Sequence, residues 1–191
     1  MIINPIVSSE NGRSDIFSLN LENRIVLLSG PIEDDMAASV ISQLLYLDSV
    51  GTAEISLYIN SPGGAVSAGM AIYDVMKTLK SPVSTICMGH AASMAAVILS
   101  GGSRGRRFIL PHGEVMIHQP SGGIDGQATD IRIAAAHIDS VKKDLNDILS
   151  ENCNVSVREM EEATERDHWM KADEAVRFGI VDGVITKEKE E

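Results

Sequence analysis

Short apolar runs alternate with longer amphipathic stretches over the first two thirds of the chain. The apolar runs have the length of strands and are closed by glycine, proline or polar residues, so they predict buried strands. The amphipathic stretches predict helices, and Pro82 stops the one that ends at Leu79. The predicted strands are 24–29, 54–60, 83–88, 107–110 and 115–118, and the predicted helices are 34–46 (capped by Asp34 or Asp35), 66–79 and 93–99. Such alternation is typical of parallel βαβ units with right-handed crossovers and predicts an α/β fold.

One long helix is predicted after this alternation, from Gln127 to about Asn152. Its apolar residues recur three and four positions apart, and its other face carries charges such as Lys142 and Lys143. A helix of about 25 residues is roughly 37 Å long. We therefore expect it to project from the domain and to pack against a neighbouring subunit. The chain then predicts helices at 157–163 and 172–178, a last strand at 184–186 and a charged tail at 187–191.

Composition narrows the class of protein. A chain of 191 residues, 44% of them hydrophobic, suits one domain with a full core. The net charge of −11 argues against a nucleic-acid partner, which needs a cationic surface. No apolar run reaches the ~18 residues that span a bilayer, and no secretory signal is visible, so we expect a cytoplasmic protein without a membrane partner. The two cysteines, Cys87 and Cys153, form neither a disulfide framework nor a metal-ligand spacing.

Ser93 is the first candidate for chemistry. An apolar run meets Gly89, three residues of turn are expected, and Ser93 then opens a helix rich in alanine and methionine. A hydroxyl at a helix N-terminus lies beside unpaired backbone N–H groups and a dipole that favours an oxyanion. This predicts a serine hydrolase, although serine is also a favoured N-cap and the Gly-x-Ser-x-Gly elbow is absent.

A serine nucleophile needs a base, an acid and oxyanion donors, and pattern alone leaves these open. Of the five histidines, His118 ends an apolar strand where polar loops gather, but each histidine has a structural alternative. Asp167 is one plausible acid among 27 carboxylic side chains, and a helix cap or a surface ion pair is its alternative. The paired glycines after Asn60 allow backbone N–H groups to face a ligand, or they form an ordinary tight turn.

A family resemblance extends from about Asp15 to Ile185. Six segments carry it, in this order: NSPGG (60–64), AGMAIYD (68–74), STICMGHAASM (84–94), MIHQP (116–120), GQATDI (126–131) and ERD (165–167). Together they resemble the proteolytic subunit of Clp proteases. The resemblance implies a crotonase-like (ClpP/crotonase) fold, a βαβ-superhelix head with a protruding handle helix. The implied parts of one protease domain, 1–191, are an axial segment (1–18), the head (19–119 and 153–186), the handle (120–152) and the tail (187–191).

The resemblance also implies roles for individual residues. Ser93 matches the nucleophile, His118 the general base and Asp167 the acid that orients it, while Gly64 and Met94 match the backbone oxyanion donors. Gln127, Asp130 and Arg166 match positions that join two rings and couple assembly to the triad. An apolar pocket that docks an unfoldase is implied for Tyr58, Ile86, Met88, Phe108, Leu110 and Ile185.

The implied assembly is two stacked seven-subunit rings that enclose the active sites. An ATP-driven AAA+ unfoldase would feed in unfolded polypeptides, which are cleaved to short peptides. The ATP site belongs to that partner, since Gly-x-x-x-x-Gly-Lys-Ser/Thr is absent here, so no cofactor is expected in this chain. The segment around Gly122, Gly123 and Ile124 resembles one that binds substrate main chain by strand addition, which predicts broad specificity.

Four features depart from the family pattern. The segment between Pro5 and Asp15 is short, Leu19 replaces a usual arginine, Thr78 replaces a pocket aromatic and Arg132 replaces an acidic residue. They raise the alternative of a poorly active structural paralogue in a mixed ring. A crotonase-type enzyme acting on acyl-CoA thioesters is a second alternative, because it shares the fold without needing Ser93.

Overall fold

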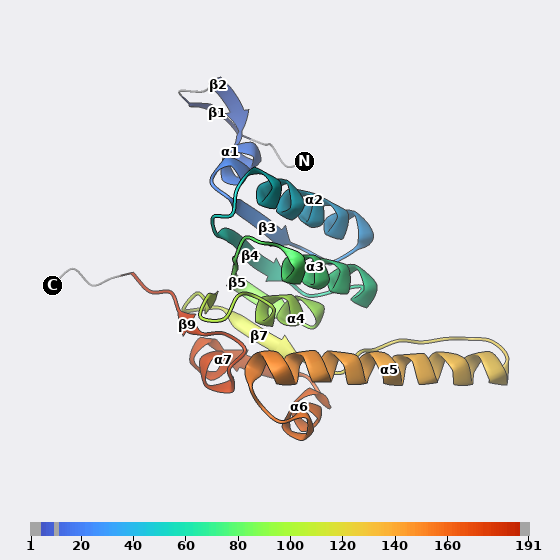
Figure 1. Ribbon diagram of the computed structural model, residues 1–191. Helices are drawn as coiled ribbons and strands as arrows, with labels where there is room; N and C mark the ends of the chain where they lie inside the picture. Colours follow the sequence, from blue (N-terminus) through green and yellow to red (C-terminus); the bar gives the residue numbers. More distant parts are fainter. Residues whose placement is uncertain (1–4, 10–11, 188–191) are drawn as a thin grey trace.

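A seven-stranded sheet forms the centre of the head in the computed structural model, which describes residues 5–9 and 12–187 (Figure 1). Its strands are β3 (Ile25–Ser29), β4 (Ile55–Ser61), β5 (Val83–Ala92), β6 (Arg107–Ile109), β7 (Glu114–Ile117), β8 (His168–Lys171) and β9 (Gly183–Val184). Strands β3, β4, β5, β6 and β9 are neighbours in that order, while β7 lies between β5 and β8. Every pair is parallel except β7 with β8. The predicted α/β fold is confirmed.

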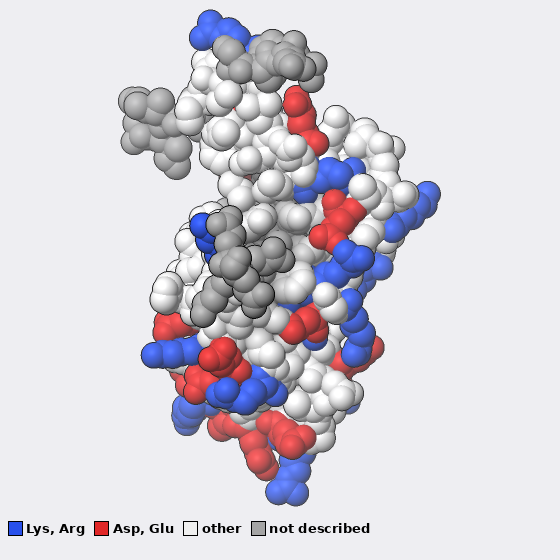
Figure 2. Space-filling model, turned by 90° about the vertical axis from the view of Figure 1, so that its left-hand side faces the viewer, with Lys and Arg blue, Asp and Glu red and all other residues white. Residues whose placement is uncertain are grey.

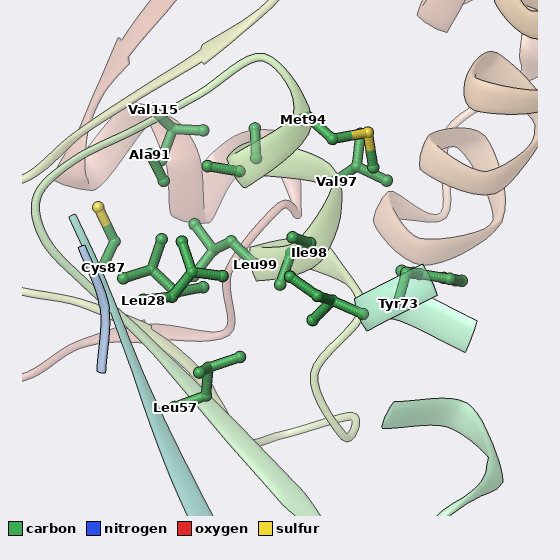
Figure 3. Close-up of a cluster of buried hydrophobic side chains, with 14 of the residues drawn as sticks. Leu28, Leu57, Tyr73, Cys87, Ala91, Met94, Val97, Ile98, Leu99 and Val115 are labelled. Atoms are coloured by element: carbon green, nitrogen blue, oxygen red, sulfur yellow. The ribbon is translucent and has the colours of Figure 1, made fainter. Parts of the chain in front are cut away.

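Four helices form a row along the sheet, each in contact with the next (Figure 1). They are α2 (Asp34–Val50), α3 (Val66–Thr78), α4 (Met94–Ser100) and the C-terminal part of α5 (Ala128–Cys153). The core lies between this row and the sheet. Figure 3 shows strand residues Leu28, Leu57 and Cys87 beside Ile98 and Leu99 of α4, all of them buried. This packing anchors α4, the helix that follows Ser93.

Helix α5 is amphipathic but is buried only toward its C-terminal end. Its buried residues begin at Leu145, and the N-terminal half projects from the head (Figure 1). The extended segment before it runs alongside, so that a Cβ on Gly122 would lie 3.1 Å from the Cδ1 of Ile138. The long helix predicted from the sequence is thus present, and its contact with a neighbouring subunit stays a prediction.

Smaller elements complete the described chain. A hairpin of β1 (Ile6–Ser9) and β2 (Gly12–Asp15) precedes the first helix, α1 (Ile16–Glu22). Two short helices, α6 (Val157–Thr164) and α7 (Ala172–Phe178), flank β8. The sequence pattern predicted α6 and α7 but not β1, β2, α1 or β8. Residues 188–191 of the expected tail and residues 1–4 and 10–11 of the expected axial segment lie outside the described ranges. Within those ranges no helix is both long and apolar enough to cross a membrane.

The turn predicted after Met88 is wrong, because β5 continues to Ala92. The strand bends at Gly89, which has φ +81°, and an added Cβ there would lie 2.7 Å from Asn60 Oδ1. Before the bend, β5 pairs with β6 at Thr85–Cys87, and after it with β7 at His90–Ala92. The residues after Met88 that were predicted to form a turn are therefore the point at which β5 changes its neighbouring strand from β6 to β7.

A nearly buried arginine ties the sheet to the C-terminal part of α5. Arg107, at the start of β6, binds Asp182 through two hydrogen bonds, Nη2 to Oδ1 at 2.5 Å and Nε to Oδ2 at 3.0 Å, and also donates to the carbonyl of Asn152. The two side chains are only 7% and 22% exposed. Burial alone would raise the pKa of Asp182, but the hydrogen bonds and charge of Arg107 outweigh it and hold that pKa below its ordinary value.

Asp182→Asn is expected to destabilise the protein by about 3 kcal/mol at pH 7, because it leaves Arg107 buried without its counter-charge. The lowered native pKa means that this stabilisation is complete above the unfolded-state pKa of about 3.9 and disappears as the pH falls through the native value. Urea unfolding should therefore separate variant from wild type at pH 7, and the difference should shrink as the pH falls below the unfolded-state pKa and through the lower native pKa. Asp147→Asn, at an exposed position of α5, is the control, and equal losses in both variants would contradict the prediction.

Candidate active site

Three strand ends meet at one edge of the sheet. Ser93 follows β5, His118 follows β7 and Asp167 precedes β8. In the parallel β5–β7 pair Ala92 faces Met116, and in the antiparallel β7–β8 pair Ile117 faces His168. These registers bring Ser93 beside the end of β7 and place Asp167 opposite His118. Residues far apart in the chain are thus gathered by strand pairing.

The three side chains form a continuous hydrogen-bonded chain. His118 Nε2 lies 2.8 Å from Ser93 Oγ, and His118 Nδ1 lies 3.0 Å from Asp167 Oδ1. Because the carboxylate accepts the proton of Nδ1, the lone pair of Nε2 is left to accept from the serine hydroxyl. This is the arrangement of a nucleophile, its general base and an orienting acid.

Ser93 has a strained backbone. Its φ of 55° and ψ of −123° lie in a region that costs a non-glycine residue of order 1–3 kcal/mol. The surroundings hold this conformation, since Ser93 N–H donates to Met116 O at 2.8 Å and Ser93 O accepts from Ala96 N–H at 2.9 Å. Ser93 occupies the N-cap position of α4, but its side chain makes no capping hydrogen bond and contacts His118 instead.

The backbone N–H groups of Gly64 and Met94, both near Ser93, donate to no described residue. Met94 is the first residue of α4, where an N–H group has no partner within the helix. Gly63 and Gly64 are pinned to Ile32, whose N–H donates to Gly63 O and whose carbonyl accepts from Ala65 N–H. An added Cβ on Gly63 would lie 2.8 Å from Ser93 Cβ, so this turn and the serine are in close contact. Such N–H groups can stabilise an oxyanion.

A small apolar pocket opens beside Ser93. It is lined by Val66, Ser93, Met94, Val97, Ile117, His118, Pro120, Leu145 and Leu149. Leu145 and Leu149 were not predicted from the sequence as residues of this site. The signal was present in the apolar stripe of the long helix, which is also the pattern of ordinary core packing.

The three residues expected to join rings are not brought together within one chain. Gln127 and Asp130 lie at the N-terminal end of α5, which projects from the head (Figure 1), whereas Arg166 follows α6, and its neighbour Glu165 contacts Lys142 in the middle of α5. The Arg166 side chain is 85% exposed and donates to the carbonyl of Glu165 at 3.1 Å. Their contact between rings stays a prediction.

The six residues expected to dock an unfoldase lie on adjacent strands. Tyr58 is paired with Ile86, and Ile86 with Phe108, across β4, β5 and β6. Met88, Leu110 and Ile185 continue the same stretch of sheet. Their strand neighbours Leu57, Cys87 and Ile109 are fully buried in the core, so the six side chains occupy the opposite face of the sheet. Their role in docking stays a prediction.

No group of three or more His, Cys, Asp or Glu side chains among the described residues is placed to hold a metal ion. Figure 2 views the molecule from the side opposite the free end of α5 and shows acidic and basic side chains interspersed, without a large area of positive charge on that face. Both cysteines are buried, and burial raises the pKa of each thiol to about 12, which keeps them in the unreactive thiol form.

A comparison with models of known protein families matches residues 8–188 to the family described as Clp protease. The chain belongs to the Clp protease family. The match covers nearly the whole chain, from the N-terminal hairpin to the residues after β9. As a Clp protease family member, the chain is a peptidase of that type, and its mostly parallel sheet with flanking helices agrees with the ClpP/crotonase-like fold expected from the resemblance.

Proposed function

We propose that this chain is a serine endopeptidase subunit of the Clp type, which cleaves unfolded polypeptides delivered by a separate AAA+ unfoldase. The observation that supports this most directly is the hydrogen-bonded chain from Ser93 Oγ through His118 to Asp167, close to two unpaired N–H groups. A hydrolase that did not use Ser93 would have no need of its strained backbone.

The geometry suggests the order of proton movements. His118 Nε2 takes the proton of Ser93 Oγ as this oxygen attacks the scissile carbonyl, and Asp167 stabilises the imidazolium that forms. The N–H groups of Gly64 and Met94 bind the oxyanion of the tetrahedral intermediate. His118 then gives its proton to the leaving amine, and a water molecule, activated in the same way, releases the acyl-enzyme.

The pocket beside Ser93 predicts an apolar side chain on the acyl side of the cleaved bond. Its walls are Val66, Val97, Leu145 and Leu149, none of which carries a polar group. The extended segment at Gly122–Ile124 can bind the main chain of a peptide by strand addition. Hydrogen bonds to the main chain do not depend on the side chains of the substrate. We therefore expect cleavage to be broad in sequence, with a preference set mainly by this one pocket.

Val66→Phe is expected to narrow the pocket and so to change the preference at that position. We compare kcat/KM for a peptide with leucine before the cleaved bond with kcat/KM for the same peptide with alanine there. The leucine-to-alanine ratio should fall by about tenfold or more, since one methylene group in an apolar pocket changes kcat/KM by a factor of about 10–200. Fluorogenic peptides that differ only at that residue measure the ratio. Val157→Phe, at an exposed position of α6, is the control, and an unchanged ratio in Val66→Phe would show that another surface sets the preference.

The assembly proposed is two stacked heptameric rings joined through α5, Gln127, Asp130 and Arg166, with an ATP-driven unfoldase on the row of six apolar residues. Enclosure of the active sites inside the rings fits a peptidase of broad specificity, because freely accessible sites would cleave other proteins of the same cell. The exposed N-terminal half of α5, with Ile131 and Ile133 on its surface, supports a further contact there.

Neither alternative gains support from a specific contact. A crotonase-type acyl-CoA enzyme would not need Ser93 and His118 to be hydrogen-bonded to each other. A structural paralogue is suggested only by the departures from the family pattern, and these lie away from the triad: Leu19 in α1, Thr78 at the end of α3 and Arg132 on the projecting half of α5.

A serine-reactive fluorophosphonate tests the proposal on the assembled protein. We expect one label per chain, mapped by peptide mass spectrometry to Ser93, and turnover of a fluorogenic peptide without ATP, since short peptides need no unfolding. Absence of both label and turnover in the assembled protein, alone and mixed with Clp subunits of the same source, would reject the proposed peptidase. Turnover that appears only in the mixture would favour the structural paralogue.

A further inference from the structure

Asp167 is not held in place by burial. Its side chain is 63% exposed, and it lies at the end of a strand rather than within one. The position of the carboxylate relative to His118 therefore depends on whatever fixes the backbone of residues 164–167.

Gln119, the residue after His118, makes two direct bonds to that backbone. Its N–H donates to Thr164 O at 2.6 Å, and its Nε2 donates to Glu165 O at 2.8 Å. These bonds join the segment that carries the base to the segment that carries the acid, two residues beyond the end of β7.

Lys142 of α5 connects the same two segments a second time. Its Nζ donates to Gln119 Oε1 at 3.0 Å and to Glu165 Oε2 at 3.1 Å. The hydrogen bond and the charge of Lys142 lower the pKa of Glu165, so the carboxylate is charged at neutral pH. The Lys142 side chain is 29% exposed, and its ammonium group has partners on both segments.

A second contact lies one helical turn along the same face of α5. The side chain of Asn146, which is 2% exposed, contacts Thr164 Oγ1 at 2.9 Å. Residues 142 and 146 are neighbours on a helix surface. Helix α5 therefore holds residues 164 and 165 at two points, one buried and one partly exposed.

We propose that Lys142 is a positioning residue of the active site: by joining Gln119 to Glu165 it holds His118 and Asp167 in hydrogen-bonding contact. The inference rests on the proposed peptidase function, but its structural part is measurable without activity. Lys142 contacts no reacting atom, and it acts through the two segments that it connects. Because it belongs to α5, the alignment of the triad depends on where that helix lies.

Lys142→Met tests this, since it keeps the aliphatic stem and removes the ammonium. In the assembled protein we expect hydrogen exchange at the amide of Gln119 to accelerate about tenfold, as its bond to Thr164 O opens more often. We expect kcat for a short peptide to fall roughly tenfold with KM little changed, less than the 10²-fold that a 1 Å misplacement costs. Lys142→Arg should restore both values in large part.

Lys143→Met is the matched control, because Lys143 is exposed, adjacent and free of side-chain bonds to described residues. The proposal is overturned if exchange at Gln119 and kcat are the same in the two methionine variants. A loss of thermal stability in Lys142→Met that Lys142→Arg does not reverse would also overturn it, in favour of a general structural role. If the wild-type protein neither cleaves peptides nor reacts with fluorophosphonate, the proposed function fails, while the exchange measurement still decides whether Lys142 holds the two segments together.

Discussion

Ser93→Ala is expected to lower peptide turnover by about 10⁶-fold, the loss that follows removal of the nucleophile of a serine triad. The alanine keeps Cβ and the backbone conformation of Ser93, so the pocket and the unpaired N–H groups should persist and KM should change little. A progress curve with a fluorogenic peptide at high enzyme concentration measures the residual rate, and fluorophosphonate labelling should disappear.

Ser140→Ala provides the control, because Ser140 lies on the exposed surface of α5 and its side chain bonds to no described residue. It should retain wild-type turnover. Residual turnover in Ser93→Ala of more than about one part in 10³ of the wild-type rate would rule out Ser93 as the nucleophile. Such a residual rate exceeds what an oxyanion site and substrate binding alone provide.

Asp167→Asn is expected to lower kcat by about 10⁴-fold while leaving the fold intact. The amide donates where the carboxylate accepted, so it favours the histidine tautomer that has its proton on Nε2, and that nitrogen then cannot accept from Ser93. Steady-state kinetics with a short peptide measure the loss, which should fall on kcat rather than KM.

The same variant should be almost neutral for stability, since the Asp167 side chain is 63% exposed. Asp173→Asn, at an exposed position of α7, is the matched control and should leave kcat unchanged. Thermal unfolding of both variants separates a catalytic from a structural effect. A kcat within tenfold of wild type in Asp167→Asn would mean that another group orients His118.

The strands and the long helix were predictable because local pattern determines them. Strand β3 is a short apolar run, β4 places its apolar residues Ile55, Leu57 and Ile59 at alternate positions, and α5 repeats apolar residues at helical spacing over its whole length. The segments that were missed carry weaker patterns. Helix α1 has no buried residue, and β8 alternates in burial over only four residues.

The partners of Ser93 were not predictable from local pattern. His118 meets Asp167 because Ile117 is paired with His168, and no feature within 165–169 indicates which strand will be its neighbour. The bend at Gly89 was misread for the same reason, since the residues after it pair with a strand more than 20 positions away. The roles of His118 and Asp167 came from the resemblance to a known family, because family members share the strand pairing that a single sequence does not reveal.

The antiparallel pairing of β7 with β8 has a consequence for biosynthesis. The acid belongs to a strand near the C-terminal end, so a chain still being made on the ribosome carries serine and histidine long before their third member emerges. Until residues 168–171 pair with β7, Asp167 is not placed against His118, so on the proposed function the unfinished chain lacks an aligned triad. On the proposed function, the order of synthesis therefore delays catalysis until the C-terminal part of the head has folded.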